Sequence, residues 1–92
     1  MAELLLTDKQ LARIRRETAD PPHNNIRLAL GLRKARQRDL AEAAGLLDSQ
    51  VSEIANGKPV MLETARRISS VFGVCVEDIF PPECAARRRR AA

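Results

Sequence analysis

Residues 37–57, with the sequence QRDLAEAAGLLDSQVSEIANG, constrain the fold more than any other part of the chain. Leu40 and Ala44 lie four residues apart with Ala41 between them. A helix here would therefore have a narrow apolar stripe, with small residues where a second helix can approach closely. Gly45 follows at the position where helices often end in the left-handed conformation. The segment predicts two short helices that cross at a tight turn.

The second helix of this pair is predicted over about residues 48–56. Val51 and Ile54, three residues apart, would bury one of its faces, and Leu46 would fill the turn. Two short helices with small residues at their crossing form either the helix-turn-helix of DNA-binding proteins or an ordinary helical hairpin. The packing pattern by itself leaves both interpretations open.

Further motifs accompany this helix pair between Asn24 and Pro81. They are Gln37, Leu40, Ala41, Gly45, Val51, Ser52, Ile54, the segment Asn56 to Lys58, the segment Leu62 to Ala65, Ile68, the segment Phe72 to Val74, and the segment Glu77 to Phe80. Together they resemble the lambda-repressor-like helix-turn-helix family, also called the Cro/C1 or Xre type. The resemblance implies an all-α fold, a compact five-helix lambda-repressor-like DNA-binding domain, to which this chain adds an extra N-terminal helix.

That N-terminal helix is predicted over residues 7–19. Thr7 and Gln10 have the spacing of a capping box, and Ile14 would lie on the apolar face. The preceding residues, Leu4 to Leu6, are too apolar to remain in water. They would either cover the core of the domain or pair with a second subunit.

Two further helices and a short last turn complete the predicted core. The first helix runs from Asn24 or Asn25 to about Lys34, and the second covers about residues 61–72. A final turn is expected over residues 76–80. The inward-facing residues are expected to be Ile26, Ala29, Leu30 and Arg33 in the first helix and Leu62, Ala65, Ile68 and Phe72 in the second.

The net charge of +4 is unevenly distributed along the chain. Residues 1–23 hold four basic and four acidic residues, residues 24–80 hold eight and seven, and residues 81–92 hold four and one. The excess positive charge therefore comes mostly from Arg87 to Arg90. Attraction to DNA phosphates must come from local basic clusters or from this tail.

Three segments are expected on these grounds. They are an N-terminal helical extension over residues 1–23, a helix-turn-helix DNA-binding domain over residues 24–81, and a basic, disordered tail over residues 82–92. A chain of 92 residues with 45% apolar residues can bury one modest core, so association would add stability. We therefore expect a homodimer, with either Leu4 to Ile14 or Val74 to Phe80 as its interface.

Cysteine and histidine content argue against disulfide and metal chemistry. Cys75 and Cys84 are too few for a disulfide framework. Cys75 is expected to be a reduced core residue, whereas Cys84 would be exposed in the tail. His23 lies in a polar connector and is expected to be a linker residue, so neither a metal site nor a cofactor is expected.

Composition also excludes several classes of function. Phe72 and Phe80 are the only aromatic residues, which argues against a protein that stacks single-stranded bases. The sequence shows neither a signal peptide nor an apolar run long enough to span a membrane, so a cytoplasmic protein without a membrane partner is expected. An enzyme is not expected, because no set of residues supplies a nucleophile, a base and an oxyanion site.

The resemblance implies that the second helix of the pair enters the major groove of double-stranded DNA. The residues implied to contact base edges are Leu47, Asp48, Ser49, Gln50 and Glu53. Those implied to contact the DNA backbone are Arg36, Gln37, Arg38, Ser52, Asn56 and Lys58. Gln50 could pair with adenine, and Glu53 could accept a hydrogen bond from the amino group of cytosine. For Gln37 and Asn56, helix capping is an equally good interpretation.

Four residues depart from the family's pattern. Asp48 and Glu53 are acidic where polar or basic residues are common, and their carboxylates would repel nearby phosphates. Lys34 stands where the family usually has a glycine, and Arg36 replaces the common threonine or serine cap. These departures affect the expected DNA contacts more than the fold.

The resemblance implies a DNA-binding transcriptional regulator. The simplest case is a repressor that binds a palindromic operator as a homodimer, with recognition helices about 34 Å apart. The segments SEIANGKP and LETARRI also resemble antitoxins. An alternative is therefore an antitoxin of a toxin-antitoxin pair, which binds a toxin protein and autoregulates its operon. A third interpretation is an interaction module whose DNA surface is disabled by Asp48 and Glu53.

Overall fold

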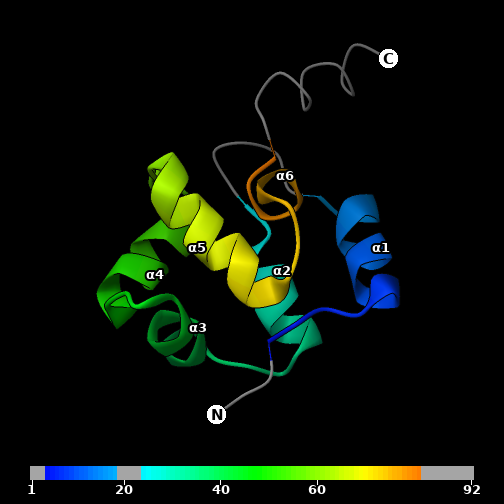
Figure 1. The fold of residues 1–92 in the computed structure, drawn as a ribbon, viewed down its shortest axis with the longest axis horizontal. Coiled ribbons are helices and arrows are strands. Elements are labelled where there is room, and N and C mark those ends of the chain that lie inside the picture. Colours follow the sequence, from blue (N-terminus) through cyan, green and yellow to red (C-terminus); the bar gives the residue numbers. More distant parts are fainter. Residues whose placement is uncertain (1–3, 19–23, 82–92) are drawn as a thin grey trace.

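The computed structural model describes residues 4–18 and 24–81, and this part of the chain folds into six α-helices without a β-strand (Figure 1). The helices are α1 (Asp8–Arg16), α2 (Ile26–Leu32), α3 (Gln37–Ala44), α4 (Asp48–Ala55), α5 (Leu62–Phe72) and α6 (Val76–Ile79). Helices α2 to α6 form the predicted five-helix domain and α1 is the extra N-terminal helix, so the all-α fold class is confirmed. None of the six described helices is long and apolar enough to cross a membrane.

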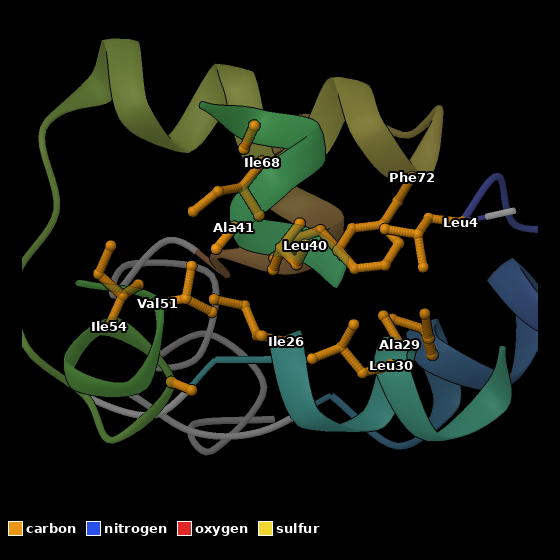
Figure 2. Close-up of a cluster of buried hydrophobic side chains, with 14 residues drawn as sticks. Leu4, Ile26, Ala29, Leu30, Leu40, Ala41, Val51, Ile54, Ile68 and Phe72 are labelled. Carbon is orange, nitrogen blue, oxygen red and sulfur yellow. The ribbon is translucent and has the colours of Figure 1, made fainter. Parts of the chain in front are cut away.

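One apolar core joins all six helices. α3 packs against both α4 and α5, and the side chains of Leu40, Ile68 and Phe72 point into the space that these helices enclose with α2 (Figure 2). Each helix contributes at least one fully buried apolar side chain: Ile14, Ile26, Leu40, Val51, Ile68, Phe72 and Ile79. Because Val51 is anchored in this shared cluster, the orientation of α4 is set by the packing of the whole domain.

α1 begins as predicted and ends earlier. The Thr7 hydroxyl accepts a hydrogen bond from the backbone N–H of Gln10 at 3.2 Å, and Gln10 Oε1 accepts one from the backbone N–H of Thr7 at 2.9 Å. The predicted capping box is therefore confirmed. The helix ends at Arg16, and the Thr18 hydroxyl donates to a carbonyl group of its last turn. The predicted helix end at Ala19, the linker role of His23, the exposure of Cys84 and the tail over residues 82–92 lie outside the described residues.

The N-terminal leucines cover the core. Leu4 is 3% exposed within the core cluster, and the backbone N–H of Leu6 donates to the carbonyl oxygen of Phe72 at 3.0 Å. This bond attaches the segment before α1 to the last residue of α5. Leu5, between Leu4 and Leu6 in the sequence, is 54% exposed. Covering the core, one of the two predicted roles, is confirmed for Leu4 and Leu6.

α2 is shorter than predicted. Ile26, Ala29 and Leu30 face the core as expected, whereas Arg33 lies just beyond the helix and is half-buried. The following residue, Lys34, has a φ of 52°, in the left-handed region. A right-handed helix cannot continue through that conformation, so the prediction of Arg33 as an inward-facing helical residue is wrong.

Two residues predicted to be buried are exposed. Leu62 is 58% exposed because the buried row of α5 begins one turn later, at Ala65. Cys75 is exposed because it precedes α6 as its N-cap residue rather than belonging to the core. Its backbone N–H donates to Asp78 Oδ2 at 3.2 Å, which turns the chain into α6 and leaves the thiol outside the core.

Candidate nucleic-acid interface

The helix pair has the geometry predicted for residues 37–57. α3 ends at Ala44, its C-cap residue Gly45 has a φ of 72°, and the backbone N–H of Leu46 donates to the carbonyl oxygen of Ala41 at 2.8 Å. Ala41 and Ala44 are buried at the crossing, where their small side chains let α4 approach α3 closely. The turn therefore fixes how α4 projects from the domain.

All five residues predicted to contact bases lie on the exposed side of α4 or immediately before it. They are Leu47, Asp48, Ser49, Gln50 and Glu53. Val51 and Ile54 face the core at 0% and 6% exposure, so the helical period turns Glu53 and the first turn of α4 outward. The most apolar member of the exposed set, Leu47, is 67% exposed. The structure thus brings the five residues together on one surface, which we call the α4 face.

Gln50 has a structural role at the start of α4. Its Oε1 accepts a hydrogen bond from the backbone N–H of Leu47 at 2.9 Å, as the third helical residue does in a capping box. Its amide NH₂ group has no hydrogen-bond partner within the described part of the chain. In this arrangement Gln50 can donate to a base without leaving the cap. A paired contact with adenine would also use Oε1, through the lone pair that the cap leaves open.

The two carboxylates of the α4 face are each close to a basic side chain. Glu53 Oε2 lies 2.5 Å from Lys58 Nζ, and Asp48 Oδ2 lies 3.9 Å from Arg38 Nε. All four side chains are more than half exposed, so water screens both pairs. The acidic residues that depart from the family's pattern are therefore balanced by cations that were predicted to contact phosphates.

The C-terminal end of α4 is held by two residues that the sequence did not indicate. Asn24 Nδ2 donates to the carbonyl oxygen of Ile54 at 2.7 Å, and the Arg27 guanidinium donates to Asn56 Oδ1. Asn24 lies just before α2 and Arg27 lies in its first turn, both about thirty positions earlier in the chain. Asn56 is also the C-cap residue of α4, so its predicted capping role is confirmed. No spacing in the sequence reveals such long-range pairs.

The remaining predicted backbone contacts flank this surface. Arg36 is exposed at the N-cap of α3, where Asp39 Oδ2 accepts from its backbone N–H at 2.9 Å, as the third helical residue does in a capping box. Gln37 is the first residue of α3 and is half-buried, as is Ser52 on α4. Arg36 and Gln37 therefore lie at the start of α3, where free helix N–H groups also favour phosphate.

A shallow hollow of about 150 Å³ lies beside the α4 face. Gln50, Glu53 and Lys58 line it together with residues of the loop between α4 and α5 and the first turn of α5. Within residues 4–18 and 24–81, no cluster of histidine, cysteine, aspartate or glutamate side chains could hold a metal ion. The chemistry available here is hydrogen bonding and charge, which suits recognition of a polar, charged macromolecule.

Comparison with known proteins supports this interpretation. Residues 25–84 match the family model of the Cro/C1-type helix-turn-helix DNA-binding domain. The match begins at the residue before α2 and includes the whole α3–turn–α4 unit, whereas α1 lies outside it. No curated protein and no solved structure matches the chain.

Proposed function

The chain belongs to the Cro/C1-type helix-turn-helix DNA-binding family, and on that basis we propose that it is a sequence-specific transcriptional regulator, in the simplest case a repressor. The observation that carries the proposal is the α4 face. Its polar side chains are exposed on a short helix whose opposite side is anchored in the core. A helix held in this way can enter a major groove without losing its own packing.

The proposed division of roles follows from position. Leu47, Asp48, Ser49, Gln50 and Glu53 read base edges, and Arg36, Gln37, Arg38, Ser52, Asn56 and Lys58 contact the phosphate backbone. Base contacts specify the sequence, whereas phosphate contacts set the register of α4 in the groove. Arg27 and Asn24 act as positioning residues, because they hold the end of α4.

We propose that the regulator acts as a homodimer on a palindromic operator. One α4 reaches only a few base pairs, so two copies spaced by about one turn of DNA are needed for useful specificity. Large exposed apolar side chains outside the α4 face support association: Leu5, Met61 and Leu62 are all more than half exposed. Sedimentation of the full chain, alone and with a selected duplex, measures the stoichiometry.

A second candidate function is that of an antitoxin, which would bind a toxin protein as well as DNA. The observation that favours it is the pair Met61 and Leu62, 76% and 58% exposed at the start of α5 and outside the α4 face. Such side chains commonly mark a protein-binding surface. Co-expression with the products of neighbouring reading frames, followed by purification, distinguishes an antitoxin from a regulator that has no protein partner besides itself.

Selection from random duplexes tests the main proposal. We expect a palindromic sequence to be enriched and its affinity to fall with rising salt concentration. Arg36→Ala should weaken all duplexes alike, because a phosphate contact carries no base information. Removal of residues 83–92 tests whether the arginine tail adds phosphate contacts. If no duplex is enriched, the chain is not a sequence-specific regulator.

A further inference from the structure

Glu53 and Lys58 form the shortest ion pair at the candidate interface. Lys58 Nζ lies 2.5 Å from Glu53 Oε2, and the backbone N–H of Lys58 also donates to the carbonyl oxygen of Glu53 at 3.1 Å. The backbone bond folds the chain after α4 back over the last turn of that helix. The side chain of Lys58 is thereby held on the α4 face instead of extending away from it.

Both members of this pair have a second use in the proposed DNA complex. Lys58 would bind a phosphate, and Glu53 would accept a hydrogen bond from a base amino group. A lysine that stays on a carboxylate presents a nearly neutral group to phosphate, and a carboxylate that loses its lysine near phosphates is repelled. The two uses therefore depend on each other.

From this arrangement we propose that Glu53 is a specificity-determining residue, because it makes the phosphate contact of Lys58 conditional on the base that Glu53 meets. On a duplex without a suitable base, Lys58 stays paired with Glu53. Where an amino group such as that of cytosine reaches Glu53, the carboxylate accepts a hydrogen bond from the base, and Lys58 leaves Glu53 to contact a phosphate. The inference rests on the proposed function.

The exposure of the pair makes this exchange feasible. The two side chains are 62% and 52% exposed, so their attraction is weakened by water and neither must be pulled out of a buried site. They also line the same hollow as Gln50, which places them beside a residue already expected to read a base. The exchange therefore needs side-chain rotations and leaves the helices in place.

The test measures the salt dependence of binding to a selected operator and to an unrelated duplex of equal length. On the unrelated duplex, Glu53→Gln should free Lys58 and steepen the slope of log affinity against log salt by about 0.9, the value for one added phosphate contact. The affinity that Glu53→Gln gains on the unrelated duplex should therefore shrink about threefold between 50 and 200 mM salt. On the operator, Glu53→Gln should instead reduce the preference for cytosine at one position.

Glu17→Gln is the matched control. Glu17 Oε2 lies 2.6 Å from Arg13 Nε, the side chains are similarly exposed, and the pair lies on and next to α1, at the opposite end of the molecule from α4 (Figure 1). Glu17→Gln therefore removes the same charge as Glu53→Gln, from a similarly exposed ion pair. We expect it to leave the salt slope unchanged. An equal gain from Glu17→Gln would mean that total charge explains the effect, and the proposal would be wrong.

Lys58→Ala separates this inference from the proposed function. In the Glu53→Gln background, where no carboxylate is left unpaired, Lys58→Ala should remove the added phosphate contact and lower the salt slope on the unrelated duplex by about 0.9. A slope that Lys58→Ala leaves unchanged in that background would overturn the exchange while leaving a sequence-specific regulator intact. If selection enriches no duplex, the regulator itself is rejected. If Glu53→Gln leaves the salt slope on the unrelated duplex unchanged, the inference is rejected, whatever the outcome of the selection.

Discussion

Arg15 Nε of α1 donates a hydrogen bond to Asp78 Oδ1 of α6 at 3.0 Å, across 63 positions of sequence. Asp78 also accepts from the backbone N–H of Cys75 through Oδ2 at 3.2 Å, and its carbonyl oxygen accepts from Asn25 Nδ2 at 2.6 Å. The hydrogen bond to Asp78 and the charge of Asp78 raise the pKa of Arg15 above its ordinary value. One residue thus ties the N-terminal helix and the start of α2 to the last helix.

Asp78→Ala should destabilise the domain. The substitution removes the acceptor that caps α6 and the partner of Arg15, and loss of a cap lowers the free energy of unfolding by about 1 kcal/mol. Urea unfolding followed by circular dichroism measures it. Glu77→Ala is the control, because Glu77 is an exposed neighbour of the same charge. Equal losses for the two variants would show that the contacts of Asp78 do not matter.

Lys34→Gly should stabilise the domain. Lys34 has a φ of 52°, a conformation that glycine adopts without the steric cost borne by a side chain. We expect the free energy of unfolding to rise by about 0.5–1 kcal/mol, after allowing for the greater freedom of glycine in the unfolded chain. Lys34→Ala removes the charge and retains the Cβ atom. A gain of similar size from Lys34→Ala would assign the effect to charge instead of backbone conformation.

Ser69→Ala should also stabilise the domain. The Ser69 hydroxyl is buried in α5 and has no hydrogen-bond partner among residues 4–18 and 24–81. Removing an unsatisfied buried hydroxyl should raise the free energy of unfolding by about 1–2 kcal/mol. Ser70→Ala, at the exposed position next to it, should give about 0.5 kcal/mol from helix propensity alone. Thermal melts of the two variants should therefore differ, with Ser69→Ala the more stable.

Replacing Gly31 or Gly45 with alanine should change the free energy of unfolding in opposite directions. Gly31 lies inside α2 with open space where a Cβ atom would go, so Gly31→Ala should add about 0.5–1 kcal/mol to the free energy of unfolding. Gly45 also has open space, but its φ is 72°. Gly45→Ala should therefore cost about 1 kcal/mol. Since neither variant creates a clash, a loss of stability in both would contradict the conformational explanation.

Residues with local signals were predicted well from the sequence. The spacing of Leu40, Ala41, Val51 and Ile54 identified the buried side of the helix pair, and Gly45 marked its turn, because helical period and left-handed glycines act over a few residues. Errors arose where burial depends on distant elements. Leu62 fits the apolar row of α5, yet it is 58% exposed, because among the described residues the buried row of α5 begins at Ala65.

The candidate interface could be predicted only in part for the same reason. Helical spacing placed Gln50 and Glu53 on the outward side, but their hydrogen-bond partners depend on how the chain folds back after α4. The pairing of Arg27 with Asn56 joins two helices far apart in sequence. Such contacts follow from tertiary packing, which a single sequence does not reveal.

Gln50→Glu separates the capping role of this residue from its proposed role in reading bases. Glutamate keeps an acceptor for the backbone N–H of Leu47, and its charge suits a helix N-terminus, so stability should be retained. It loses the amide donor, so the base preference found by duplex selection should change. Gln50→Ala should change the preference too and lower the free energy of unfolding by about 0.5 kcal/mol. Gln37→Glu is the control, because the same chemical change at a proposed phosphate contact should weaken all duplexes and preserve their ranking. A Gln50→Glu variant that keeps the original preference would show that the Gln50 side chain does not read the base sequence.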